Sequence, residues 1–173
     1  VGHGGEIHFG TRVDDLVQVD AAVTGVRTAT GAQIDGTGVI LATGHSARDV
    51  YALLERRGLR LVPKPFALGV RVEHAQSLVD AAQYHCAPRP AGLPPASYAL
   101  RRRLDDRSVY SFCMCPGGII CPATTSADAV VVNGWSPSRR NSRWANSGIV
   151  VEITTADVHA WSGDGVLAGL RLQ

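Results

Sequence analysis

Three of the four cysteines of this 173-residue chain lie in one short stretch, FCMCPGGIICPA, and thiols are suited to redox or nucleophilic chemistry. Cys113 and Cys115 are one residue apart, so on an extended strand both thiols face the same side. A turn of one proline and two glycines follows. Its glycines permit positive φ and leave backbone N–H groups free to hold an anion or polarise a carbonyl. The stretch is therefore a candidate site of thiol chemistry.

The cysteines are also compatible with two different roles, in packing and in metal binding. Free cysteines are most often small buried hydrophobic residues. Alternatively, Cys113, Cys115 and Cys121, together with the pair His85-Cys86, supply enough soft ligands for zinc or an iron–sulfur cluster. The spacing argues against a metal, because zinc sites usually place about two to four residues between paired ligands. We therefore assign no metal ligand.

A second candidate is the stretch GVILATGHSARDV, which joins an apolar run to the start of a helix. The run at 38–43 is typical of a parallel strand buried on both faces. The strand is expected to end at Ala42, Thr43 and Gly44, with Ser46 capping the helix. Such strand ends bind ligands in α/β proteins, because the next helix points its first N–H groups there. An ordinary turn without a ligand has the same pattern, so both interpretations stay open.

The strands around this stretch resemble those of two-dinucleotide-binding-domain flavoproteins. The matching segments are TRVDDL, VTGVRT and QIDGTGVILATG, in that order. The resemblance implies that FAD is the cofactor and that Val13 contacts its adenine through the backbone amide and carbonyl. It also implies that the residues around ATG lie near the dinucleotide, namely Ala42, Thr43, Gly44 and His45.

The second half of the chain resembles the uncharacterised FAD-dependent dehydrogenases of bacteria. The segments that carry the resemblance are VPKPFALGVRVEH, LPPASYAL, VYSFCMCPGGIICPA, VVVNGWS and ANSGIVVEI. The resemblance implies an FAD-dependent oxidoreductase that transfers two electrons to or from a small-molecule substrate. A nicotinamide or a protein is then the expected electron donor or acceptor. A metal-binding module and an interaction domain without a cofactor are the alternative functions.

With FAD as the implied cofactor, we expect two short segments to face the flavin. Cys115, with Cys113 beside it, is the catalytic candidate, as a redox-tuning or proton-donating group. The further cofactor contacts are Pro116, Gly117 and Gly118 in the turn and Asn146, Ser147 and Gly148 in ANSG. Outside these segments, Arg71 and Glu73 share one face of a predicted strand and are expected to pair with each other.

The family's glycine-rich phosphate loop, GxGxxG, and its acidic ribose-binding residue have no counterpart in the chain. We therefore expect an internal fragment of a longer flavoprotein, and whether it holds FAD by itself stays open. The expected fold class is α/β, as part of an interrupted, Rossmann-like FAD-binding domain with an inserted α+β domain. Residues 1–61 form the partial FAD-binding domain, 62–156 the inserted substrate domain, and 157–173 a return segment.

The composition narrows the class of protein. Apolar residues make up 45% of the chain, no apolar run approaches the length of a membrane span, and no signal-peptide pattern is present. A net charge of +2 is too small to favour a nucleic-acid partner. Four cysteines in a chain of this length do not indicate a disulfide scaffold, so we expect a reduced, cytoplasmic setting and no membrane partner.

Overall fold

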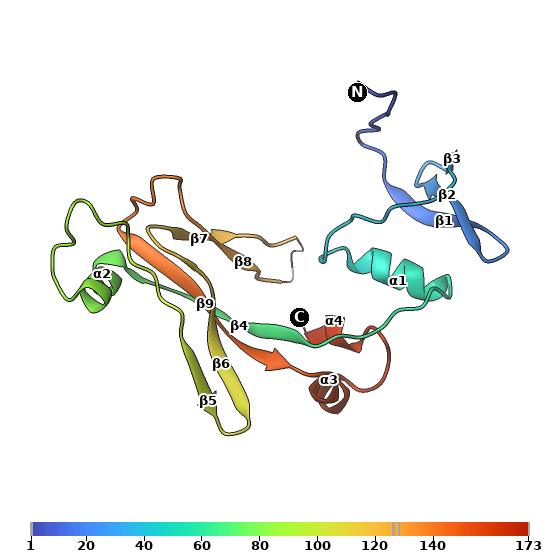
Figure 1. The fold of residues 1–173 in the computed structure, drawn as a ribbon. Helices are drawn as coiled ribbons and strands as arrows, with labels where there is room; N and C mark the ends of the chain where they lie inside the picture. The colour runs from blue at the N-terminus through green and yellow to red at the C-terminus, as the bar shows by residue number, and fades with distance from the viewer. Residues whose placement is uncertain (1, 126, 128, 173) are drawn as a thin grey trace. The chain divides into compact units, whose positions relative to one another are not determined.

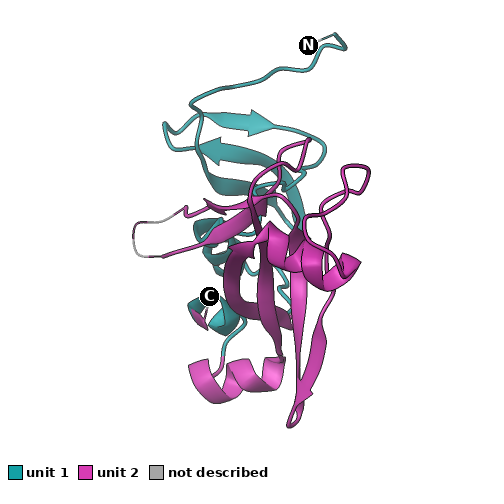
Figure 2. Ribbon diagram, turned by 90° about the vertical axis from the view of Figure 1, so that its left-hand side faces the viewer, with its two compact units in different colours: residues 1–63, 165–171 teal, residues 64–164, 172–173 magenta. Residues whose placement is uncertain are grey.

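The chain divides into two compact units in a computed structural model that describes residues 2–125, 127 and 129–172. Unit 1 comprises residues 1–63 and 165–171, and unit 2 comprises residues 64–164 and 172–173 (Figure 2). The predicted segments 1–61 and 157–173 include residue 1 and residue 173, and these two residues lie outside the described residues. The roles assigned to those segments stay predictions. None of the helices in the described residues is long and apolar enough to cross a membrane.

Unit 1 contains a three-stranded antiparallel sheet, helix α1 (Arg48–Arg56) and most of helix α4 (Ala168–Leu172) (Figure 1). The strands are β1 (Val13–Val19), β2 (Ala22–Thr28) and β3 (Gln33–Asp35), in that spatial order. A tight turn at Asp20, whose φ is +53°, joins the first two strands. Helix α1 contacts β1, and Leu53 of the helix and Leu16 of the strand are both buried.

The predicted buried strand at 38–43 is wrong. These residues form no strand and are exposed, with Ile40 95% and Leu41 50% accessible. The apolar run is typical of a strand covered on both faces, but no described residue pairs with its backbone. The predicted cap is also wrong, because the helix begins after Ala47 with no side-chain cap and the Ser46 hydroxyl bonds to the His45 ring instead.

Unit 2 is built on a four-stranded antiparallel sheet in the order β4-β9-β6-β5. Its strands are β4 (Phe66–Ala75), β5 (Arg101–Leu104), β6 (Arg107–Cys115) and β9 (Trp144–Ile153). The outer strand β4 pairs with β9 along its whole length, from Phe66 opposite Ile153 to Ala75 opposite Trp144. Directly opposite residues share a face of the sheet, so this register sorts the side chains into two faces.

Different elements cover the two faces. The helix face carries Ala145 of β9, which packs with Val79 of helix α2 (Gln76–Tyr84) and with Ala96 of the proline-rich loop. The hairpin face carries Arg71 and Asn146, which contact the hairpin of β7 (Ile119–Pro122) and β8 (Val132–Trp135). After β9 come the helices α3 (Thr155–Ser162) and α4 (Ala168–Leu172).

The predicted α/β, Rossmann-like fold class is wrong. Every strand pair in the described residues is antiparallel, so the chain forms small β-rich units with short helices. Tight turns join β1 to β2 and β5 to β6, with positive φ at Asp20 and Asp105. Such turns suffice for antiparallel strands, whereas parallel strands need a crossover of about a dozen residues or more.

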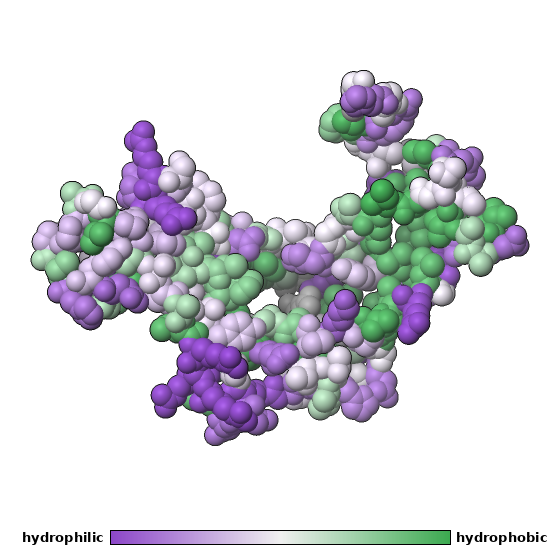
Figure 3. Space-filling model, in the orientation of Figure 1, coloured by the Kyte–Doolittle hydropathy of each residue, from purple (hydrophilic) through white to green (hydrophobic). Residues whose placement is uncertain are grey.

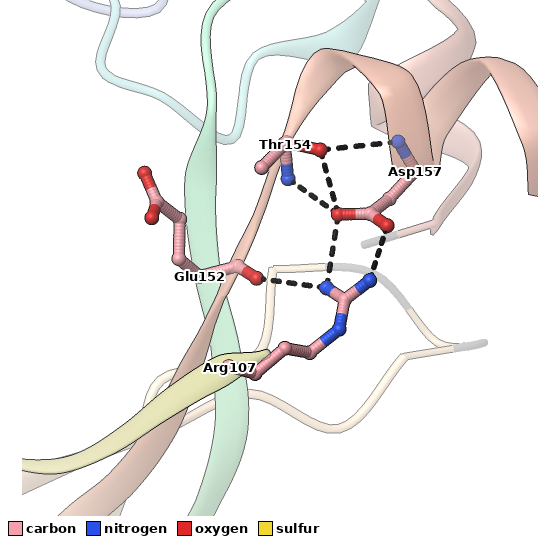
Figure 4. A network of polar contacts seen from close by, with 4 residues as sticks. All are labelled: Arg107, Glu152, Thr154 and Asp157. Carbon is pink, nitrogen blue, oxygen red and sulfur yellow. Dashed lines mark hydrogen bonds and ion pairs between the residues drawn. The ribbon is translucent and has the colours of Figure 1, made fainter. Parts of the chain in front are cut away.

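A network around Asp157 ties the start of α3 to the sheet of unit 2 (Figure 4). The Asp157 carboxylate accepts hydrogen bonds from the Thr154 amide and hydroxyl, both at 2.8 Å, and the Thr154 hydroxyl accepts from the Asp157 amide. Both terminal nitrogens of Arg107 in β6 also donate to this carboxylate, and Nη1 donates to the Glu152 carbonyl. The Arg107 and Thr154 bonds hold the pKa of Asp157 well below its ordinary value of 3.8.

We expect the Asp157→Asn substitution to remove acid sensitivity from the folding of unit 2. A lowered pKa in the folded state means that Asp157 stabilises the fold above pH 3.8 and that this contribution is lost as pH falls below that value. The wild-type melting temperature should therefore fall more steeply than that of Asp157→Asn between about pH 5 and about pH 2.5. At pH 7 the variant should melt several degrees lower.

Differential scanning calorimetry of both proteins across this pH range measures the effect. Asp105→Asn serves as the control, because it removes an equal charge from the turn between β5 and β6, and the Asp105 charge is not among those that act on Arg107 or Asp157. Parallel melting curves for wild type and Asp157→Asn would show that the network is not coupled to folding.

Candidate functional site

A polar cluster lies on the hairpin face of unit 2 and joins three strands. Arg71 of β4 donates through Nη1 to the Asn146 side-chain oxygen at 2.6 Å and to the Cys113 carbonyl at 3.1 Å. The same nitrogen lies 3.9 Å from the Cys115 sulfur. Cys115 stands directly opposite Asn146 in the β6–β9 ladder, so the two side chains share this face. The structure thus brings the predicted residues Cys115 and Asn146 together around Arg71.

The backbone at Cys113 breaks the regular repeat of β6. Cys113 has φ of +46°, and the register with β9 shifts between Phe112 and Cys115, which marks a β-bulge. Cys113 is exposed, whereas Cys115 is half-buried and donates from sulfur to the Cys113 carbonyl at 3.3 Å. The two-residue alternation used to place both thiols on one face therefore does not hold here. The sequence pattern of alternating residues does not reveal where such a bulge occurs.

Gly134 of β8 covers the cluster from the hairpin side. A Cβ atom at Gly134 would lie 2.5 Å from both the Asn146 side-chain oxygen and the Cys115 sulfur, and closer still to the Arg71 guanidinium. Asn146 is fully buried, and its side-chain nitrogen is a buried donor without a hydrogen-bond partner. The cluster therefore contains a tightly held cation, a half-buried thiol and one unused donor. Sequence reasoning missed Arg71 and Gly134 as members, because only the strand register places them here.

The predicted Pro-Gly-Gly turn is buried rather than open. Pro116, Gly117 and Gly118 are all buried, and the Gly117 N–H donates to the Gln76 side chain at 2.7 Å. The expectation that this amide is free is therefore wrong. Gln76 in turn donates to Asp80 and to the Ala96 carbonyl, so the turn is anchored to α2 and to the proline-rich loop.

The remaining residues predicted in ANSG are buried as well. Ser147 is fully buried and its hydroxyl donates to backbone carbonyls, and Gly148 lies opposite Phe112. The expected ion pair between Arg71 and Glu73 is wrong. Glu73 accepts from the Ile120 amide of the hairpin, while Arg71 binds within the cluster.

The predicted cofactor contacts of unit 1 are all exposed. Val13 is 42% accessible, and Ala42, Thr43, Gly44 and His45 lie on the surface. Figure 3 shows hydrophobic residues gathered over unit 1, where β1 to β3 and the segment 38–44 lie in Figure 1. Gly44 has φ of +77°, and no atom lies within 4 Å of the position of an added Cβ. Among the described residues none hydrogen-bonds to the backbone of 38–44, so this backbone fits close approach by a ligand.

Unit 1 also contains a pocket of about 520 Å³ that the sequence did not indicate. Its lining comprises Asp14, Asp15, Arg27, Leu53, Arg56 and Arg57. Arg57 pairs with Asp15, and this side-chain contact lowers the pKa of that carboxyl. None of the predicted cofactor residues lines this pocket.

The cysteines do not gather into a metal site. Among residues 2–125, 127 and 129–172, no group of three or more His, Cys, Asp or Glu side chains is placed to hold a metal ion. All four cysteines are free, with Cys86 and Cys113 exposed and Cys115 and Cys121 half-buried. The geometry therefore gives no support to the zinc or iron–sulfur alternative.

Comparison with known proteins identifies the family of the chain. An uncharacterized protein of Clostridium beijerinckii is 35% identical to the chain over 172 residues. That match covers 98% of the chain and 32% of the relative, so the chain spans about a third of the length of the curated relative that it matches. Residues 65–173 match the family model described as FAD-dependent protein, C-terminal domain-like. Because this match covers more than half of the chain, the chain belongs to the FAD-dependent protein, C-terminal domain-like family.

Proposed function

We propose that the chain is part of an FAD-dependent oxidoreductase that transfers two electrons to or from a small-molecule substrate. The observation that carries the proposal is the accessible, unpaired backbone of residues 38–44, which ends in Ala42, Thr43 and Gly44. Membership of an FAD-dependent family supports it. When bound, FAD supplies the electron-transfer chemistry, and the protein binds and orients the reactants.

Unit 1 would hold the cofactor through backbone contacts. The free N–H and C=O groups around Thr43 and Gly44 donate and accept hydrogen bonds, and the absence of a side chain at Gly44 leaves room for a ligand. Val13 is exposed at the start of β1, an outer strand of its sheet, where an adenine ring can reach it. The exposed apolar side chains of Ile40 and Leu41 would lose contact with water when a bound cofactor covers them, which favours binding.

The visible spectrum of the purified, intact gene product tests the proposal. Bound flavin gives a characteristic absorbance, and reduction by a two-electron donor bleaches it. Metal analysis of the same sample distinguishes the metal-binding alternative. A colourless, folded protein that does not take up added FAD would overturn the proposal and favour an interaction domain.

We expect the Gly44→Val substitution to lower FAD affinity by about tenfold or more in the intact protein, since a branched side chain would occupy the space of the ligand. Gly31→Val is the matched control. Gly31 also has positive φ, at +86°, and open space around it, so the substitution imposes the same backbone strain away from residues 38–44. FAD titration followed by flavin fluorescence measures both affinities. Equal affinity of the two variants would remove Gly44 from the cofactor site.

A further inference from the structure

Cys115 has polar surroundings that set it apart from the other cysteines. A guanidinium nitrogen of Arg71 lies 3.9 Å from its sulfur, and Asn146 stands opposite it across the β6–β9 ladder. Cys86 and Cys113 are more exposed, but among the hydrogen bonds of the described residues no side-chain cation donates to either sulfur. Cys115 is therefore less exposed than these two cysteines, but it has a cation held close to its sulfur, which they do not.

Asn146 adds a donor that the fold itself does not use. Its side-chain oxygen accepts from Arg71 at 2.6 Å, which fixes the amide with the nitrogen left over. That nitrogen is buried and without a partner, although the residue is 0% accessible. Buried donors are nearly always paired, so this one, in the residue directly opposite Cys115, is available to an acceptor that forms on the sulfur.

We propose that Cys115 is a site of oxidation by hydrogen peroxide, with Asn146 and Arg71 as positioning residues for the oxidised sulfur. The Cys115 thiolate attacks one peroxide oxygen, so that an S–O bond forms and the O–O bond breaks. Sulfur loses two electrons to the peroxide, and the departing hydroxide takes a proton to become water. The product is a sulfenic acid, whose oxygen accepts from the Asn146 side-chain nitrogen.

Arg71 acts on the same step through its charge. The sulfur carries negative charge as it attacks, and the oxygen of the sulfenic acid carries partial negative charge afterwards. A guanidinium held by Asn146 and the Cys113 carbonyl stays in place through both. This inference goes beyond the proposed function and does not depend on it, because the reaction needs peroxide and the cluster of unit 2 rather than FAD.

Peptide mass spectrometry after timed exposure of the protein to hydrogen peroxide and dimedone tests the proposal. Dimedone labels sulfenic acids, and the four cysteines serve as internal controls for one another. Cys115 should be labelled about tenfold faster than Cys86, Cys113 or Cys121, despite its lower exposure than the first two. If Cys86 or Cys113 of the wild-type protein is labelled faster than Cys115, that result alone overturns the proposal.

Two variants test the positioning residues. Asn146→Asp keeps the oxygen that binds Arg71 but replaces the unused donor with an acceptor, so Cys115 labelling should slow about tenfold while Cys121 is unaffected. Arg71→Gln should give a similar loss. Arg103→Gln removes the same charge from exposed β5 and should label like wild type. Wild-type labelling rates in folded Asn146→Asp or Arg71→Gln would contradict the assignment. If neither variant folds, the relative labelling rates of the four cysteines in the wild-type protein decide whether the proposal holds.

Discussion

Replacing Gly117 by alanine is expected to destabilise unit 2 by about 3 to 5 kcal/mol. Gly117 has φ of +57°, a conformation that alanine adopts only at a cost. An added Cβ would also lie closer than 3 Å to the backbone carbonyl group of Arg140, and backbone cannot move aside as a flexible side chain can. The two costs add, because one arises within residue 117 and the other from its neighbour.

The same substitution should disturb the network that holds the turn. The Gly117 amide donates to Gln76, and the Gly117 carbonyl accepts from the Ser142 amide at 3.2 Å. Displacing the turn leaves the buried Gln76 side chain without one partner, which costs free energy beyond the steric clash.

Thermal unfolding followed by circular dichroism measures this effect, and the melting temperature should fall by about 10 °C or more. Gly92→Ala is the matched control, because Gly92 lies in the same unit with negative φ and no atom within 4 Å of an added Cβ. A Gly117→Ala protein that melts with the Gly92→Ala protein would show that the turn differs from the structure described.

The second large effect is expected for Gly134→Val, which should destabilise unit 2 by about 2 to 4 kcal/mol. The Arg71 guanidinium is the flexible end of a long side chain and can move away from an added Cβ. Asn146 and Cys115 are shorter and belong to paired strands, so they cannot. Valine would therefore either break the contact between Arg71 and Asn146 or lift β8 from the sheet.

Thermal unfolding and the rate of Cys115 modification by a thiol reagent distinguish the expected outcome from a general loss of stability. Modification of Cys115 should accelerate because the cover over its sulfur has moved. Asn133→Val is the matched control, since Asn133 is exposed and precedes Gly134 in the same strand with its side chain on the opposite face. If the Gly134→Val protein has the same stability and the same Cys115 reactivity as the Asn133→Val protein, Gly134 does not pack against Arg71, Asn146 and Cys115 as described.

Local patterns were sufficient to predict many of the elements. The stretches VTGVRTA at 23–29, FALGVRVEH at 66–74 and SGIVVEIT at 147–154 each predict a strand, and the structure has β2, β4 and β9 there. The helical spacing of Val50, Leu53 and Leu54 with Gly58 as a stop predicts a helix within 46–58, which appears as α1 (Arg48–Arg56), and the stretch SLVDAAQYH predicts the helix that appears as α2. These predictions are confirmed because strand alternation, helix spacing and helix stops depend on neighbouring residues.

Membership of an FAD-dependent family is also confirmed, and nearly all of the second-half motifs that indicated it lie within the matched residues 65–173. The dehydrogenase activity and the individual cofactor contacts stay predictions. Motif resemblance identifies a family from residue types in order, but it does not say whether a given amide is free. Gly117 illustrates the difference, because its N–H is used by Gln76, 41 residues earlier in the chain.

The sequence by itself determined the short-range features of this protein: strand and helix segments, turns at glycine and aspartate, and the motifs shared with FAD-dependent proteins. Only the tertiary structure decided that all the described strand pairs are antiparallel and that the apolar run at 38–43 lies exposed and unpaired. It also decided that Arg71, Asn146 and Gly134 meet at Cys115. The physical reason is that strand direction, register and bulges depend on pairing between segments far apart in the chain, whereas a local apolar pattern records only that a segment needs cover.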